Sequence, residues 1–93
     1  LFPPEDPDVL AALAAAVADD PAVAAAYAAP AESADLLLTL VLTRDAEPVA
    51  TAQAVAERLR DNVVLRARLG RGADIAVLRP GGTPAGRLLH PPR

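Results

Sequence analysis

The sequence predicts one α+β domain, a two-layer sandwich in which a small antiparallel sheet of three or more strands carries two helices on one face. Three observations predict it. A chain of 93 residues has room for a single core. Apolar residues make up 53% of it and charged residues 23%, as in packed rather than disordered chains. The apolar spacing changes between helical and alternating in the order helix, strand, strand, helix, strand. We therefore expect a single domain over 1–93, with an extended entry segment at 1–6 and a tail rich in proline and glycine at 80–93.

The first helix is predicted over Pro7 to Ala18. Asp6 is a good N-cap, and Pro7 fits the first turn because its missing N–H would have no partner there. An apolar stripe at helical spacing follows, formed by Val9, Leu10, Leu13 and Val17. The Asp19-Asp20-Pro21 sequence ends the helix, because a residue before proline is pushed out of the helical region. The stripe is expected to cover a sheet.

Two strands are predicted next, over 21–29 and 35–43, and they are expected to pair as a hairpin. In the first, Val23, Ala25 and Tyr27 alternate and would point toward the helices. The second is the clearest strand of the chain, being rich in Leu, Val and Thr. Its inward residues would be Leu36, Leu38, Leu40 and Leu42.

The second helix is predicted to open at Ala46-Glu47-Pro48. Its stripe would be formed by Val49, Ala52, Ala56, Leu59 and Val63. The pattern leaves two ends open, one near Asp61 and one near Leu69, and Gly70 and Gly72 stop the helix in either case. A third strand follows over 73–79, and the tail is expected to be a loop whose end docks through Leu88 and Leu89.

This architecture leaves the second face of the sheet unusually apolar. Side chains alternate along a strand, so the residues between the inward leucines face away from the helices. A sheet covered on one side normally shows a polar outer face, and contiguous apolar patches mark interfaces. The predicted interface consists of Leu37, Thr39, Val41, Ala24, Ala26 and Leu78. Three covers are possible: a second copy giving a homodimer, a companion domain of a longer parent protein, or the Leu88-Leu89 tail. A mildly apolar open face is the remaining alternative.

Composition excludes several functional classes. The chain has no cysteine and one histidine, which removes thiol catalysis, disulfide frameworks and cysteine zinc sites. We expect no metal and no cofactor. A net charge of −3 disfavours binding to nucleic acid. No stretch approaches the ~20 apolar residues of a membrane span. The acids at 5, 6 and 8 do not fit a signal peptide, so a cytoplasmic location is expected. Arginine without lysine, beside abundant alanine and proline, indicates a bacterial source of high GC content.

One group of side chains is a candidate anion site. Arg66, Arg68 and Arg71 flank Gly70 and Gly72, and guanidinium groups beside a glycine loop can hold a phosphate or a carboxylate. Solvated arginines at a helix C-terminus explain the same pattern. The other chemistry-bearing residues fit surface or element-end positions better than catalysis: His90, Ser33, the Asp19-Asp20 pair and the Asp45/Glu47 pair. No acid, base or nucleophile is expected to converge, so we predict no enzyme.

The order of landmarks resembles the C-terminal domain of the SseB (enhanced serine sensitivity) family. The resemblance rests on the Asp-Asp-Pro-Ala-Val-Ala-Ala-Ala-Tyr-Ala stretch at 19–28, the strand at 36–42, the late strand at 73–78 and the proline-containing end at 88–92. The chain departs from the family pattern at Pro91-Pro92-Arg93, where an aromatic finish is expected. The resemblance implies a bacterial cytoplasmic protein, an accessory or interaction module that follows an N-terminal domain. The family provides no catalytic residues to carry over.

These observations predict a non-enzymatic association or accessory domain that binds a like copy or a companion domain through its sheet face. The alternative is a regulatory domain that binds a small molecule or an anion at segment 66–72.

Overall fold

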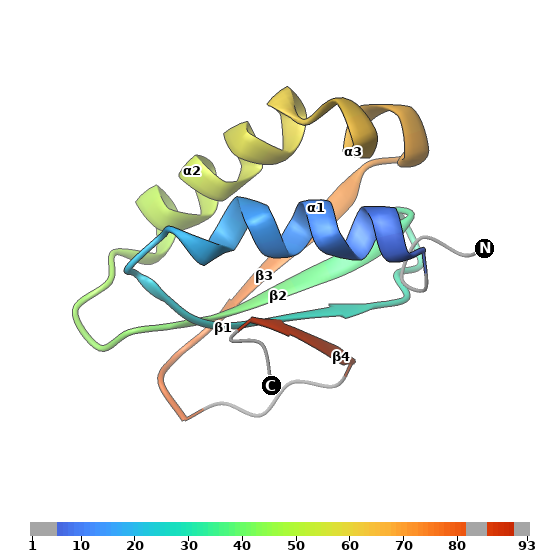
Figure 1. Cartoon of the computed structure of the whole chain (residues 1–93). Coiled ribbons are helices and arrows are strands. Elements are labelled where there is room, and N and C mark those ends of the chain that lie inside the picture. The colour runs from blue at the N-terminus through green and yellow to red at the C-terminus, as the bar shows by residue number, and fades with distance from the viewer. Residues whose placement is uncertain (1–5, 82–85, 91–93) are drawn as a thin grey trace.

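The computed structural model describes residues 6–81 and 86–90. Over these residues the chain has an α+β fold with three helices and a four-stranded mixed sheet (Figure 1). The strands lie side by side in the order β3-β2-β1-β4. The elements, in chain order, are α1 (Pro7–Ala18), β1 (Val23–Ala29), β2 (Leu36–Leu42), α2 (Pro48–Asp61), α3 (Val63–Arg68), β3 (Ala73–Leu78) and β4 (Arg87–His90). Most of the predicted entry segment, and residues 82–85 and 91–93 of the tail, lie outside the described residues.

Helix α1 has the predicted bounds and the predicted cap. The Asp6 carboxylate accepts a hydrogen bond from the Asp8 N–H at 3.0 Å, which satisfies one of the free donors of the first turn. Val9, Leu13 and Val17 are completely buried, and Leu10 packs against the same core. The predicted stripe is therefore confirmed.

Strands β1 and β2 form the predicted antiparallel hairpin, but a bulge changes the phase of β1. Val23 lies opposite Leu42, and the register shifts between Val23 and Ala25. The extra residue turns Ala26 into the core, where its side chain is completely buried, and Tyr27 onto the opposite face. The prediction that Ala26 lies on the outer face, and Tyr27 on the inner one, is wrong for this reason.

The sheet is mixed rather than antiparallel, because β3 runs parallel to β2. A helix between two neighbouring strands carries the chain back to the end of the sheet where it began. The 14 residues of α2 span about 21 Å, close to the ~23 Å of a seven-residue strand. The chain therefore enters β3 beside the start of β2, and Leu36 pairs with Ala73.

The second predicted helix is two helices. Asn62 adopts an extended conformation and ends α2, and its side chain accepts a hydrogen bond from the Leu65 N–H at 3.1 Å to cap α3. The buried face of α2 is also rotated from the predicted stripe. Thr51, Val55 and Leu59 are buried, four residues apart, whereas Val49 and Val63 are exposed.

The tail contributes a strand that the sequence did not predict. Residues 87–90 form β4, which pairs with the free edge of β1 and places Leu88 opposite Tyr27. The element order is thus α-β-β-α-α-β-β, not α-β-β-α-β. Four residues after a run of glycine and proline carry too short an alternating pattern to indicate a strand.

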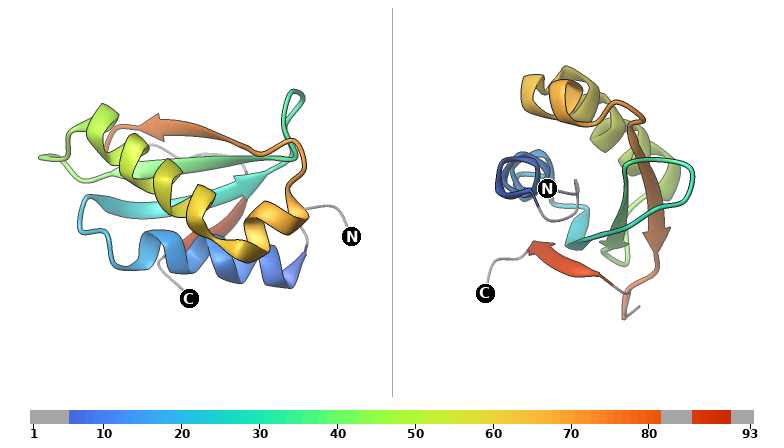
Figure 2. Two further views of the ribbon diagram at one scale, coloured as in Figure 1. Left: turned by 90° about the horizontal axis from the view of Figure 1, so that it is seen from above. Right: turned by 90° about the vertical axis from the view of Figure 1, so that its right-hand side faces the viewer.

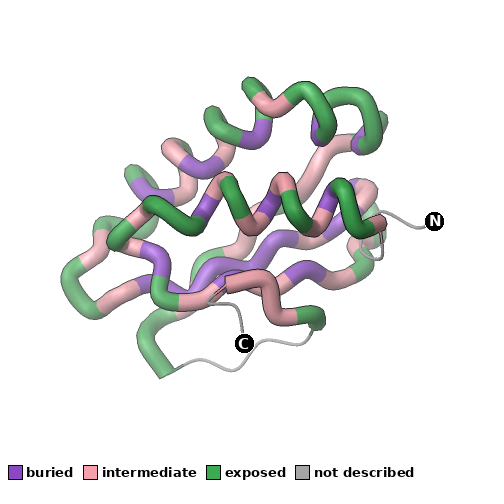
Figure 3. Tube along the Cα trace, in the orientation of Figure 1, coloured by how far each residue is buried: buried purple, intermediate pink, exposed green. Residues whose placement is uncertain are grey.

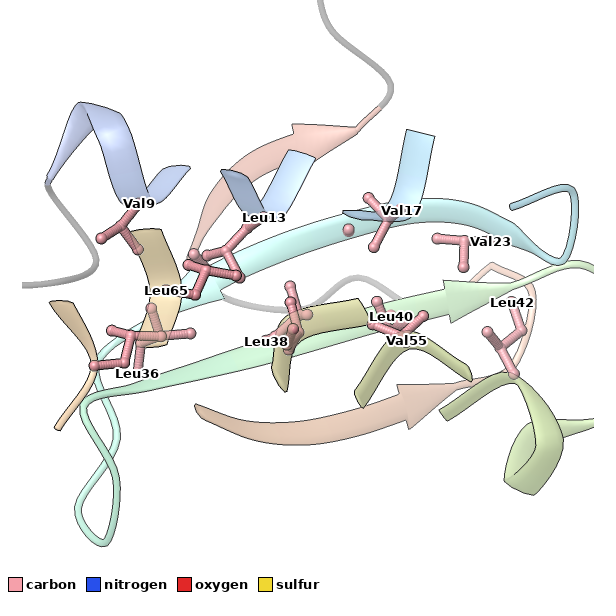
Figure 4. Close-up of a cluster of buried hydrophobic side chains, with 14 residues drawn as sticks. Val9, Leu13, Val17, Val23, Leu36, Leu38, Leu40, Leu42, Val55 and Leu65 are labelled. Carbon is pink, nitrogen blue, oxygen red and sulfur yellow. The ribbon is translucent and has the colours of Figure 1, made fainter. Parts of the chain in front are cut away.

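The three helices lie on one side of the curved sheet (Figure 2). Between helices and sheet lies the core, and its largest fully buried side chains come from α1, from β2 and, with Val55, from α2 (Figure 4). Helix α1 contacts β1 and β4, and α2 contacts β3. The buried positions alternate with half-buried and exposed ones along each helix (Figure 3). The inner residues of β2 are Leu36, Leu38, Leu40 and Leu42, as predicted.

Replacing Leu38 by alanine tests this phase. Leu38 is completely buried among the helices, whereas Leu37 next to it is half-buried on the other face. Leu38→Ala is expected to lower the free energy of unfolding by about 2–5 kcal/mol, because it removes buried methyl groups and leaves a cavity. Leu37→Ala, measured by urea denaturation at the same low protein concentration, is expected to cost clearly less. Equal losses would contradict the assigned faces of β2.

Candidate functional site

The outer face of the sheet, the side turned away from the helices, consists of three rows of side chains that cross the strands. The pairings fix the rows, because residues directly opposite one another in neighbouring strands point to the same side. They are Ala25, Val41 and Leu78 in the first row, Leu88, Tyr27, Thr39 and Ala76 in the second, and Ala29, Leu37 and Asp74 in the third. We call these ten residues the outer face. Nine of them are uncharged, and the acid lies on the edge strand β3.

The middle of the outer face is already closely packed. Thr39 and Val41 are only 5% and 6% exposed, although they point away from the helices. The residues around them are half-buried, among them Leu37, Tyr27 and Leu78. No helix of the described residues lies on this side of the sheet (Figure 2). The centre of the outer face is therefore already largely removed from solvent within the chain itself, and the residues around it are half-buried or exposed.

Of the predicted interface residues, Leu37, Thr39, Val41 and Leu78 lie on the outer face, whereas Ala26 lies in the core. Ala24 is exposed at the bulge. Sequence analysis missed Tyr27 and Leu88. Regular alternation predicts Tyr27 on the inner face, and the bulge in β1 turns it to the outer one. Leu88 belongs to a strand that forms only through its pairing with β1.

The three arginines of the predicted anion site point to three different parts of the molecule. Arg68 forms ion pairs with Asp6 at 2.8 Å and Asp8 at 3.4 Å, at the start of α1. Arg71 donates to the Glu32 carbonyl at 2.9 Å, in the turn between β1 and β2. Arg66 lines a hollow between α2, α3 and β3. This arrangement does not form a single anion site from all three arginines. The guanidinium groups of Arg68 and Arg71 already bind other groups of the chain.

The hollow beside Arg66 has a volume of about 340 Å³. Its lining includes the buried leucines Leu59, Leu65 and Leu69, and its charged residues are Arg60 and Arg66. Arg60, in the last turn of α2, is not one of the predicted anion-site residues. Nothing in the sequence brings it next to Arg66, because the break at Asn62 sets the angle between the two helices.

The other candidate residues are spread over separate elements. His90 lies on β4 opposite Ala26, and Ser33 donates a hydrogen bond to Asp74 at 3.1 Å. Asp20 pairs with Arg58 at 3.0 Å, and Glu47 caps α2. Within residues 6–81 and 86–90, no three His, Cys, Asp or Glu side chains are grouped as metal ligands would be. No helix in that part of the chain is long and apolar enough to cross a membrane.

Comparison with protein-family models, curated proteins and solved structures finds no match to this chain. The resemblance to the SseB family accordingly stays a prediction based on the apolar pattern.

The surroundings of the Asp6 carboxylate shift its pKa. Partial burial favours its neutral form and by itself would raise its pKa. Hydrogen bonds from the Asp8 N–H, the Arg68 guanidinium and the Val9 N–H, together with the positive charge of Arg68, outweigh burial. The pKa of Asp6 is therefore held below its usual value, and its carboxylate connects the start of α1 to α3.

Because the folded pKa of Asp6 lies below the unfolded one, ionised Asp6 stabilises the fold fully above about pH 4. This stabilisation is lost as the pH falls through the lowered folded pKa. Asp6→Asn keeps an N-capping side chain but removes the charge. We expect urea denaturation of this variant to show a smaller loss of stability between neutral and acid pH than the wild type. Asp45→Asn, at an exposed turn, is the control, and an unchanged acid slope in Asp6→Asn would contradict the ion pair.

Proposed function

We propose that the chain is a non-enzymatic association domain that uses the outer face to bind a second protein surface. One observation carries the proposal: β2 is apolar on both of its sides, and the helices cover only one of them. An antiparallel or mixed sheet with one free side normally alternates apolar and polar residues. On the side turned away from the helices, Leu37 and Val41 break that alternation, and of the two Leu37 is half-buried whereas Val41 is only 6% exposed.

The chemistry of the outer face favours a protein over the other partners considered. Its ten residues include no arginine, so they offer nothing that attracts anionic lipid or phosphate. Tyr27 lies near the middle, and tyrosine is enriched in interface centres because one ring buries a large area. An apolar sheet face packs most simply on another apolar sheet or helix layer.

A second copy of the chain or a companion domain of a longer protein are the two partners with the required chemistry. A second copy meets the requirement directly. A two-fold axis that lies between the two copies, parallel to β2 and above Thr39, would place each row against the same row of the partner. The single acid, Asp74, lies at the β3 edge, where it can stay in water. A homodimer through the outer face is therefore the assembly to test first.

An association role rather than catalysis is supported by the distribution of the chemical groups. The histidine, the serine and the acids described above belong to different elements and already serve as caps or tethers in several cases. Assignment as an SseB-like accessory module of the bacterial cytoplasm is part of the same proposal, and it rests on the sequence pattern at 19–28 and 36–42.

The test is the solution mass of the 93-residue chain over a concentration series. We expect the mass to rise from 9.5 kDa toward twice that value as concentration increases. Leu37→Arg should keep the chain monomeric, because taking a charged guanidinium out of water costs more than its pairing with Asp74 returns. In the monomer the new arginine is tolerated, since Asp74 lies directly opposite position 37 on β3.

Val63→Arg is the matched control, because it adds the same charge at an apolar side chain that is 78% exposed on α3. It should dimerise like the wild type. A wild-type chain that stays monomeric at every concentration would contradict self-association and leave a companion domain as the partner. Equal dimerisation of Leu37→Arg would contradict the outer face itself.

A further inference from the structure

The hollow between α2, α3 and β3 has the construction of a small-ligand site on the helical side of the molecule. It is formed where three elements diverge, and small residues on two of them leave it unfilled. Ala56 on α2 and Gly72 and Ala73 at the start of β3 present at most one methyl group each toward it. Larger side chains at these positions would close the space, so the hollow follows from the alanine-rich composition of the chain.

The floor of the hollow is apolar and is part of the buried core. Leu59, Leu65 and Leu69 are 8%, 2% and 8% exposed, and all three belong to the buried core cluster. Ile75 packs against the same cluster from β3. A hydrocarbon or aromatic group that enters the hollow would therefore meet mainly carbon at its floor, and its transfer from water is favourable.

The charged side chains of the hollow are both positive. Arg60 comes from the last turn of α2 and Arg66 from α3, and both are exposed. Within the described residues, neither forms an ion pair or a side-chain hydrogen bond, in contrast to Arg58, Arg68 and Arg71. Two unpaired guanidinium groups beside a single hollow attract an anion, and carboxylate matches the fork of their donors.

We propose that this hollow binds a small carboxylic acid with an apolar body, such as a medium-chain fatty acid. The body lies against the three leucines and Ile75, and the carboxylate is held at the rim between Arg60 and Arg66. A volume of about 340 Å³ is at the lower end of the range found for small-molecule sites. A bare inorganic anion would leave the apolar floor in contact with water, and a neutral hydrocarbon would leave the two arginines unused. Only a ligand with both parts satisfies the whole hollow.

The probe is octanoate, titrated into the isotopically labelled 93-residue chain and followed through backbone amide chemical shifts. We expect saturable shifts confined to the amides of residues 56–75 that line the hollow. Octan-1-ol has the same tail without the charge, and acetate has the charge without the tail. Each should bind at least about tenfold more weakly than octanoate, because each loses one of the two interactions.

Three variants separate the contributions. Ala56→Leu fills the hollow from α2 and should abolish the saturable shifts while the melting temperature stays close to that of the wild type. The double change Arg60→Gln and Arg66→Gln should reduce octanoate affinity about tenfold, to that of octan-1-ol. Arg44→Gln removes the same kind of charge near a different hollow, between Leu42 and Pro80, and should leave octanoate affinity unchanged.

Several outcomes would overturn the proposal. Absence of saturable shifts in the lining residues excludes the site. Equal affinity for octanoate and octan-1-ol, or an unchanged affinity in the double arginine variant, excludes recognition of the carboxylate. Shifts of the same amides on raising the protein concentration alone would show that a second copy occupies the hollow, which also overturns a small-ligand site. Because the hollow and the outer face lie on opposite sides of the sheet, Leu37→Arg should bind octanoate as the wild type does.

Discussion

The packing of four leucines from one strand against the helices is the interaction on which the rest of the structure depends. Alanine is the commonest residue of the chain, but only Ala26 and Ala28 belong to the buried core cluster, whose other members are leucine and valine. Leu36, Leu38, Leu40 and Leu42 supply the largest part of the bulk, and β2 carries them in the interior of the sheet, between β1 and β3. Helix α1 contributes Val9, Leu13 and Val17 to the same core. These four leucines determine where the helices lie, because the helices must pack over β2 to bury them.

Two arginines connect α2 and α3 to the two ends of α1. Arg58 of α2 reaches Asp20 and the Ala16 carbonyl, after the end and in the last turn of α1, at 3.0 and 3.1 Å. Arg68 of α3 reaches Asp6 and Asp8 at the opposite end of α1. Exposed pairs of this kind add little stability one by one, but they fix the direction of a helix whose alanines provide few side-chain contacts. They also explain why an arginine cluster in the sequence does not act as a cluster in space.

The two candidate sites lie on opposite sides of the sheet. On the outer face, Leu37 and Val41 of β2 lie on either side of Thr39, and this is the surface that we propose for association. On the helical side, Ala56, Gly72 and Ala73 fail to fill the space between α2, α3 and β3, and Arg60 and Arg66 stand beside the hollow that remains. The two sites can act independently because the sheet separates them.

The sequence by itself determined the features that depend on local spacing. Asp6 and Pro7 define the start of α1, the alternation of β2 separates its inner leucines from Leu37 and Val41, and the glycines after α3 stop the second helical segment. Only the tertiary structure decided the features that depend on pairing between distant segments. The bulge in β1 reversed Ala26 and Tyr27, the helical return made β3 parallel, and β4 formed because the free edge of β1 offered it hydrogen bonds. The placement of Arg60 and Arg66 beside the same hollow is also a feature that only the tertiary structure decided. Local periodicity shows which way a side chain points within its own element, whereas the neighbours it meets are chosen by the packing of the whole core.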